Sequence, residues 1–492
     1  MGRALAGRTL AALAALTVLA GCASGAAEPA PTQNPRAAPA GPATAPAETP
    51  AAQAPSAQAP LVLAVHPTRP ALNVSVATAR NLIAGKVRSW TALRAGRGPV
   101  RLAAGPQVSD APAAARRESD RAALAATERD PLTVAVVPAA AVGPSVRAVS
   151  VDGRHPLRDP ARYPITIAGP APGQVITATA VGDIMLARRV GRAMAAAGDF
   201  AAALRPTARR LATADLTVGN LENTLDRSGA PRQGNDSFGG DPRVTRGLRL
   251  AGFDALSLAN NHLGDYGPRA LARTVRLLRD AGFATFGAGA NSAAARKAAI
   301  VERAGVRFGF LAFNAIGETP TARRDRPGAV SVRMQPRTGP LNKADLAAMA
   351  ADVRALRERA DVVVVYPHWG QQYTTEEVPD QRRVGRALVD AGADVVIGSH
   401  PHWVQGAEIY RSKLIAYSLG NFVFDMDFSR PTQEGVVLEL VFWGDQVKSA
   451  EFVPVRIGSD FAPRFLARRA GQPILDRMWA ASGPPFSASP RS

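Results

Sequence analysis

Two histidines separated by one residue stand where a short apolar run ends. His400 and His402 belong to Gly398-Ser399-His400-Pro401-His402, which directly follows Asp394-Val395-Val396-Ile397. The apolar run predicts a buried strand, and open α/β sheets commonly bind ligands at the carboxyl ends of their strands. Pro401 disfavours a helical conformation at His400, so the pattern predicts an extended segment with both rings on one side. Two neutral imidazoles in that arrangement can bind one metal ion; the alternative is a pair of loop histidines bonded to backbone groups.

Four further apolar runs also end in side chains that bind metals or move protons. They are Asp183 after 175–181, Glu222 after 216–218, Asn261, His262 and Asp265 after 255–258, and His368 after 362–366. Taken singly, Asp183 or Asn261 could cap a helix or turn, and His368 could be a hydrogen-bonded core histidine. Four of the six histidines fall in these motifs, which favours one shared site. Carboxylate, amide and imidazole ligands suit one or two divalent ions of Mn, Fe or Zn better than Ca.

The elements that must position these residues alternate along the chain. Strand-like runs are interspersed with helical patterns at 186–197, 269–281, 343–359 and 381–391. Such alternation predicts a layered α/β domain, which we place at residues 173–460.

The chain resembles the CapA family, named for a poly-γ-glutamate capsule synthesis protein and related to calcineurin-like metallophosphoesterases. The resemblance lies in the motifs GDIM, GNLENTL, FDALSLANNHLGDYG, HWG, GADVVIGSHPHWVQG and YSLGNFVFD, in this order. It implies a four-layer α/β/β/α sandwich. It also implies that His262 protonates a leaving oxygen or holds a phosphoryl group, and that the metal ligands are Asp183, Glu222, Asn261, His368, His400 and His402. Asp265 could orient His262, although its spacing equally suits the turn at 264–267.

Two positions depart from the phosphoesterase pattern. Met185 stands where that pattern, Asp-x-His, has a histidine, and Glu222 replaces a bridging aspartate. One metal position therefore loses an imidazole, which leaves open whether the site holds one ion or two.

The N-terminus has the pattern of an export signal. Arg3 and Arg8 precede an apolar stretch at 10–19 that is too short to span a membrane, and Leu19-Ala20-Gly21-Cys22 resembles a lipoprotein cleavage box. We therefore expect a signal peptide at 1–22, a lipidated Cys22 and an extracytoplasmic, membrane-anchored protein. The alternative is an ordinary secretory signal with an incidental cysteine. Cys22 is the only cysteine, so no intramolecular disulfide can form.

Three other segments differ from the large domain in composition. Residues 23–60 are rich in Ala and Pro and predict a disordered spacer, and residues 461–492 predict a loosely held tail. Residues 61–172 predict a small α/β lobe that resembles part of a phosphate-type periplasmic solute-binding protein. Because the gripping segments of that family are not evident, we interpret the lobe as a structural or docking domain rather than an active phosphate receptor.

The chain is strongly basic. It has 59 Lys and Arg against 40 Asp and Glu, a formal charge of +19. This charge would attract an anionic envelope polymer, although a general bias toward arginine codons explains it equally well. We expect no nucleic-acid partner, because there is no dense basic run or basic motif studded with aromatic residues.

Together these patterns predict an exported metal-dependent hydrolase or transferase. It would act in synthesis, export or remodelling of an anionic polymer such as poly-γ-glutamate, beside capsule-synthesis or export proteins. One alternative is a phosphodiesterase or phosphatase acting on envelope or nucleotide phosphoesters. The other is a non-catalytic, metal-containing scaffold of a polymer export complex. Met185 favours the scaffold, whereas His262 favours an enzyme, because that residue serves chemistry more than metal binding.

Overall fold

The computed structural model describes residues 57–112 and 115–487. The predicted signal peptide with Cys22, and the predicted spacer as far as residue 56, lie outside the described residues. None of the helices in the described ranges combines the length and the apolarity needed to cross a bilayer.

Residues 58–168 form a small α/β unit around one mixed sheet. Its strand order is β4 (Arg116–Arg117), β3 (Arg101–Ala104), β5 (Thr133–Pro138), β1 (Gln58–Val65) and β6 (Arg147–Ala148), with β8 (Thr166–Ala168) also paired to β1. The helices are α1 (Val76–Ile83) and α2 (Asp120–Arg129), and a short pair joins β2 (Asn73–Val74) to β7 (Ser150–Val151). The spacer prediction was wrong for residues 58–60, because Ala59 is buried and pairs with Ile167 of β8. Backbone pairing orders this stretch despite its Ala and Pro composition.

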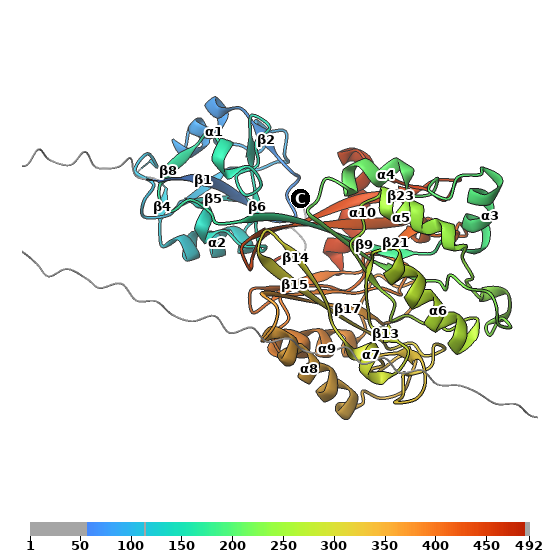
Figure 1. Ribbon diagram of the computed structural model, residues 1–492. Coiled ribbons are helices and arrows are strands. Elements are labelled where there is room, and N and C mark those ends of the chain that lie inside the picture. The colour runs from blue at the N-terminus through green and yellow to red at the C-terminus, as the bar shows by residue number, and fades with distance from the viewer. Residues whose placement is uncertain (1–56, 113–114, 488–492) are drawn as a thin grey trace, which may run out of the picture. The chain divides into compact units, whose positions relative to one another are not determined.

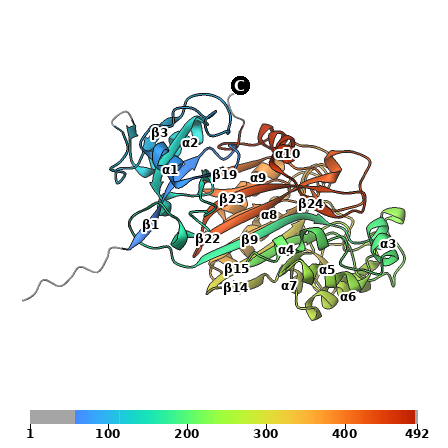
Figure 2. The ribbon, with the colours of Figure 1, turned by 90° about the horizontal axis from the view of Figure 1, so that it is seen from above.

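Two sheets form the centre of the larger part. The first has the order β12 (Ala284–Phe286), β11 (Ala255–Ser257), β10 (Leu216–Leu221), β9 (Val175–Ile184), β22 (Glu434–Trp443), β23 (Gln446–Ile457) and β24 (Pro463–Phe465), with β21 (Asn421–Val423) also paired to β9. Strands β9 to β12 are parallel, while β22 runs antiparallel to β9. Figure 2 shows β22 and β23 lying beside β9.

The second sheet has the order β14 (Ala299–Arg303), β15 (Val306–Asn314), β17 (Val362–His368), β18 (Val395–Ile397), β20 (Lys413–Ala416) and β19 (Ala407–Tyr410). Its four middle strands are parallel. A smaller pair joins β13 (Ala288–Gly289) to β16 (Gly328–Ala329), next to α7 (Ser292–Arg296).

Alternating side chains place the second sheet between the first sheet and a layer of helices. Phe308 meets Phe442 of the first sheet with ring centroids 5.1 Å apart, whereas Val363 and Val365 belong to the core under α8 (Lys343–Arg357) and α9 (Pro379–Asp390). The helices of the first sheet are α3 (Arg188–Ala196), α4 (Arg205–Leu211), α5 (Thr245–Leu250) and α6 (Gly267–Asp280), whose apolar residues join the same core as that sheet. Figure 1 shows α8 and α9 together beyond β17, with α6 in the opposite layer. The four-layer α/β/β/α prediction is confirmed.

The prediction of a loosely held tail was wrong for residues 461–487, and residues 488–492 lie outside the described residues. Helix α10 (Arg468–Ala480) packs on β23. The ring of Trp479 stacks on that of Phe486 at 5.5 Å, and both side chains are buried in the main core. Ile474 and Met478 lie one helical turn apart on the same face, and this amphipathic spacing orders a stretch whose Arg and Pro content indicated a tail.

Candidate metal centre

The carboxyl ends of parallel strands from both sheets meet at one point. The first sheet brings Asp183 near the end of β9, Glu222 directly after β10 and Asn261 after β11. The second sheet brings His368 as the last residue of β17 and His400 and His402 after β18. One sheet therefore supplies the oxygen donors and the other supplies the imidazoles. All six residues are at most 5% exposed.

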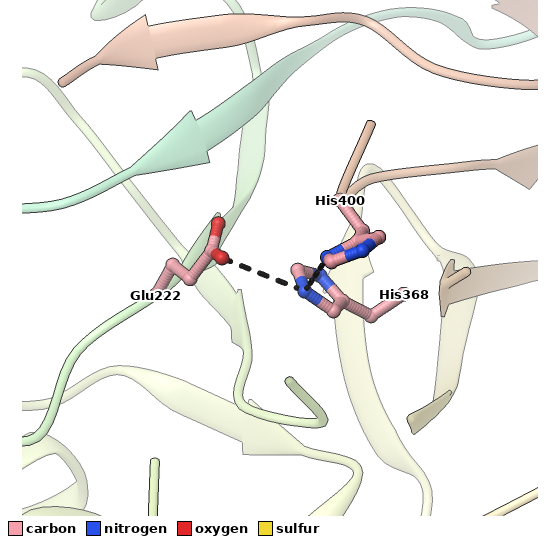
Figure 3. A group of neighbouring side chains, drawn as sticks. All are labelled: Glu222, His368 and His400. Carbon is pink, nitrogen blue, oxygen red and sulfur yellow. Dashed lines mark hydrogen bonds and ion pairs between the residues drawn. The ribbon is translucent and has the colours of Figure 1, made fainter. Parts of the chain in front are cut away.

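His368 interacts with both Glu222 and His400, as Figure 3 shows. Its Nε2 is 2.7 Å from Oδ1 of Asn261, 3.2 Å from Nδ1 of His400 and 3.5 Å from Oε1 of Glu222. Two sets of donor atoms lie close enough together to hold a metal ion. One set is Glu222, His368 and His400, and the other is Asp183, Glu222 and His402. Glu222 is common to both sets, as a carboxylate bridging two positions would be.

The polar atoms of the centre fit a divalent cation. Both carboxylate oxygens of Glu222 and Nε2 of His400 are buried and have no hydrogen-bond partner. A buried neutral polar atom without a hydrogen-bond partner costs about 1–3 kcal/mol, and a charged one costs more. Three such atoms in one cluster therefore indicate that a further group binds there. Carboxylate, amide and imidazole donors match Mn, Fe or Zn.

Hydrogen bonds outside the ligand set orient two imidazoles. Nδ1 of His368 lies 3.0 Å from Oγ of Ser399, whose hydroxyl donates to the carbonyl of Pro367. The side chain of Asn421 donates to the carbonyl of Thr432, so its Oδ1 accepts from Nδ1 of His402 at 2.9 Å. The ring of His402 therefore keeps Nε2 unprotonated and able to bind a metal.

Burial shifts the pKa of every titratable metal ligand in the direction that favours its neutral form. It raises the pKa of Asp183 to about 7 and, together with the neighbouring Asp183, holds the pKa of Glu222 well above its usual range. Burial likewise lowers the pKa of His402 to about 3 and puts those of His368 and His400 well below the usual value. Neutral imidazoles are competent ligands at neutral pH, and a bound cation would favour both ionised carboxylates.

The prediction that the His400-Pro401-His402 segment is extended was wrong. The φ angles of His400 and His402 are 96° and 58°, which side-chain-bearing residues rarely adopt. Tertiary hydrogen bonds hold this conformation: the backbone N–H of His400 donates to Oδ2 of Asp183 at 3.1 Å, and the backbone N–H of Tyr373 donates to the carbonyl of Pro401. The two rings still come close, with centroids 5.8 Å apart, so both reach the centre through a strained turn.

His262 and Asp265 form a hydrogen-bonded pair beside the ligands. Nδ1 of His262 lies 2.9 Å from Oδ2 of Asp265, and the ring of Phe238 stacks on the imidazole at 3.6 Å. Asp265 also accepts bonds of 2.6 Å from the side chain of Gln233 and from the backbone N–H of Phe238. Its carboxylate therefore orients the imidazole and secures the loop that covers it.

Met185 takes no part in either donor set. Its backbone N–H bonds the carbonyl of Val423, and its buried sulfur accepts from the backbone N–H of Ala187 at 3.1 Å. The thioether of Met185 therefore stabilises the turn that follows β9 and does not serve as a metal ligand.

Several residues of the site had not been predicted. Asn220 donates to Oδ1 of Asp183 at 2.8 Å and accepts from Asn260 at 3.0 Å, so it orients the first carboxylate. Its place two residues before Glu222 in the buried GNLEN motif was a usable signal. No comparable signal marked Tyr373, whose ring lies over His402 with centroids 6.1 Å apart. Burial raises the pKa of Tyr373, the charge of Glu222 raises it further, and Arg188 opposes both.

Comparisons with known proteins agree with these motifs. Residues 177–426 match the family described as bacterial capsule synthesis protein PGA_cap. The chain is similar to the capsule biosynthesis protein CapA of Bacillus anthracis, with 31% identity over 288 residues, covering 57% of this chain and 67% of that protein. It is 30% identical to the PGA biosynthesis protein CapA of Bacillus subtilis (strain 168) over 269 residues, covering 54% of this chain and 67% of that protein.

A solved structure of an ABC-type phosphate transport receptor from Vibrio cholerae is matched with 14% identity and a TM-score of 0.20, over 21% of this chain and 50% of that chain. So low a score carries no argument, and the likeness of residues 61–172 to solute-binding proteins stays a prediction.

Proposed function

The chain belongs to the family of bacterial capsule synthesis proteins, and we propose that it is a metal-dependent hydrolase or transferase acting on an anionic cell-envelope polymer such as poly-γ-glutamate. One observation carries the proposal. A buried group of carboxylate, amide and imidazole donors lies directly beside a His262–Asp265 pair, so binding of a cation and movement of a proton can act on the same substrate bond.

The residues divide the work between two roles. Glu222, His368 and His400, with Asn261, would hold one ion, and Asp183 and His402 would share Glu222 around a second position. A divalent ion bound there supplies a Lewis acid that polarises a carbonyl or phosphoryl oxygen.

His262 would transfer the proton. Its Nδ1 faces Asp265, so Nε2 is free to take a proton from the attacking nucleophile and give it to the leaving group. Asp265 stabilises the imidazolium formed between these two transfers.

The experiment that tests this proposal measures metal content and activity on the same protein. The purified chain is loaded with Mn²⁺, Fe²⁺ or Zn²⁺ and assayed on poly-γ-glutamate and on phosphodiesters. We expect cleavage of poly-γ-glutamate that H262A lowers by about 100-fold or more while its metal content stays unchanged. Absence of activity with every metal would instead support the scaffold hypothesis, which Met185 favours. Activity confined to phosphodiesters would support the phosphoesterase hypothesis.

We further propose that the protein acts outside the cytoplasm, anchored by a lipid on Cys22, beside capsule-synthesis or export proteins. The support is the charged and apolar pattern that ends in Leu19-Ala20-Gly21-Cys22. Globomycin should make the unprocessed precursor accumulate in cells, and an unchanged size would contradict the anchor.

A further inference from the structure

Exposed aromatic side chains gather at one place on the described surface. Within residues 57–112 and 115–487, the large hydrophobic side chains that are exposed are Leu250 (44%), Ile300 (36%), Tyr373 (37%) and Phe428 (65%). Tyr373 and Phe428 come from different loops, yet they meet edge to face with ring centroids 5.4 Å apart and an interplanar angle of 87°. Exposed apolar side chains are unremarkable singly, whereas two in contact form a surface that a ligand can cover.

This aromatic pair is continuous with the metal centre. The ring of Tyr373 lies nearly parallel to that of His402, at 28°, and its backbone N–H bonds the carbonyl of Pro401 at 2.9 Å. The φ angle of Tyr373 is 61°, so its position is held at a cost in backbone strain. Phe428 then extends the surface from Tyr373 toward solvent.

A cationic side chain is linked to the same side of the centre through packed rings: Phe238 meets Phe424 edge to face at 5.8 Å, and Phe424 meets His402 at 4.8 Å. Arg188 has a φ angle of 43°, and its buried Nε has no hydrogen-bond partner. Its guanidinium carbon is 4.4 Å from the centroid of Phe238, the ring that stacks on His262. Its Nη2 pairs with the buried carboxylate of Asp425, while its Nη1 lies 3.1 Å from Asp236, whose side chain is 77% exposed. The exposed pair contributes little to stability, and an anionic ligand could replace Asp236 there.

We propose that Tyr373 and Phe428 form a subsite that binds the methylene segments of a flexible polyanionic chain, while Arg188 pairs with one of its carboxylates. This inference rests on the proposed function, since it concerns the substrate of the same centre. The rings of Tyr373 and Phe428 are nearly perpendicular, so they do not form two parallel aromatic faces between which a planar nucleobase could stack. A chain that alternates methylene groups with carboxylates matches both the aromatic pair and the guanidinium.

The test measures binding of a synthetic γ-linked glutamate decamer by calorimetry, with Mn²⁺ and again with EDTA. F428A should weaken binding by about fivefold to tenfold, the effect of losing one aromatic contact. F428Y should restore it. The control is L250A, which removes another exposed apolar side chain, from α5, and should bind like the unsubstituted protein. Phe428 belongs to neither set of metal donors, so metal content should be equal in all four proteins and the effect of F428A on decamer binding should persist in EDTA.

The outcomes separate the subsite from the function. Binding that F428A leaves unchanged overturns the subsite alone. A decamer that does not bind the unsubstituted protein, with or without Mn²⁺, overturns the proposed polymer substrate and the subsite together. If adenosine monophosphate binds instead and F428A weakens it, the aromatic pair recognises a base and the proposal is wrong.

Discussion

Nδ1 of His262 lies 2.9 Å from Oδ2 of Asp265, in a pair that is almost completely buried. The carboxylate of Asp265 also accepts hydrogen bonds from Gln233 and from the backbone N–H of Phe238. One aspartate therefore orients the imidazole and also positions the Phe238 ring that stacks on it. A proton-transfer residue held in this way needs no rearrangement during the reaction.

Replacing Asp265 should therefore impair catalysis without removing metal. D265N should lower kcat by about 100-fold, with a much smaller change in KM, because the imidazolium loses its stabilising charge. The control D280N changes an exposed aspartate at the end of α6 and should be neutral. Steady-state kinetics and elemental analysis on the same samples check this, and loss of metal in D265N would show that the pair has a structural role in the centre.

The C-terminal segment should contribute strongly to stability. Phe486 is fully buried between Trp479 and Phe452, so F486A should reduce the free energy of unfolding by about 3–5 kcal/mol. F428A removes the same side chain from an exposed position and should change it by less than about 0.5 kcal/mol. Urea unfolding of both variants makes the comparison, and equal small effects would mean that residues 461–487 are not part of the core.

The strand ends carrying the site could be predicted because the signal is local: an apolar run followed at once by Asp, Asn or His. The arrangement of the sheets could not, since β9 pairs with β22 across more than two hundred residues of chain. The turn at His400 depends on tertiary hydrogen bonds of His400 and Pro401, and the proline by itself indicated the wrong conformation. Helix α10 was not predicted because the Arg and Pro content of this segment hid its weak amphipathic pattern. No sequence pattern indicated that the side chain of Phe428 lies next to Tyr373.

Lys448 should make stability depend on pH in the alkaline range. Its ammonium donates to the carbonyl of Ala140 at 2.7 Å, and burial lowers its pKa from 10.5 to about 8. Between these two values the unfolded chain binds more protons than the folded one, so this group makes the protein more stable as pH rises from about 8 to about 10.5. Urea unfolding across this pH range should show that the free energy of unfolding rises more steeply with pH for the unsubstituted protein than for K448M. Parallel curves would contradict the burial of this amine.

Metal stoichiometry should reveal how many ions the centre holds, because Glu222 belongs to both donor sets while His368 and His402 belong to one each. If two ions bind, H368A and H402A should each lose one and E222Q should lose both, since a neutral amide bridges poorly. With a single ion, bound by the set of Glu222, His368 and His400, H368A should abolish binding whereas H402A should only weaken it. H155A alters a histidine of the small lobe and should keep the full content. Elemental analysis after removal of free metal distinguishes these patterns, and full metal content in both H368A and H402A would refute the ligand assignment.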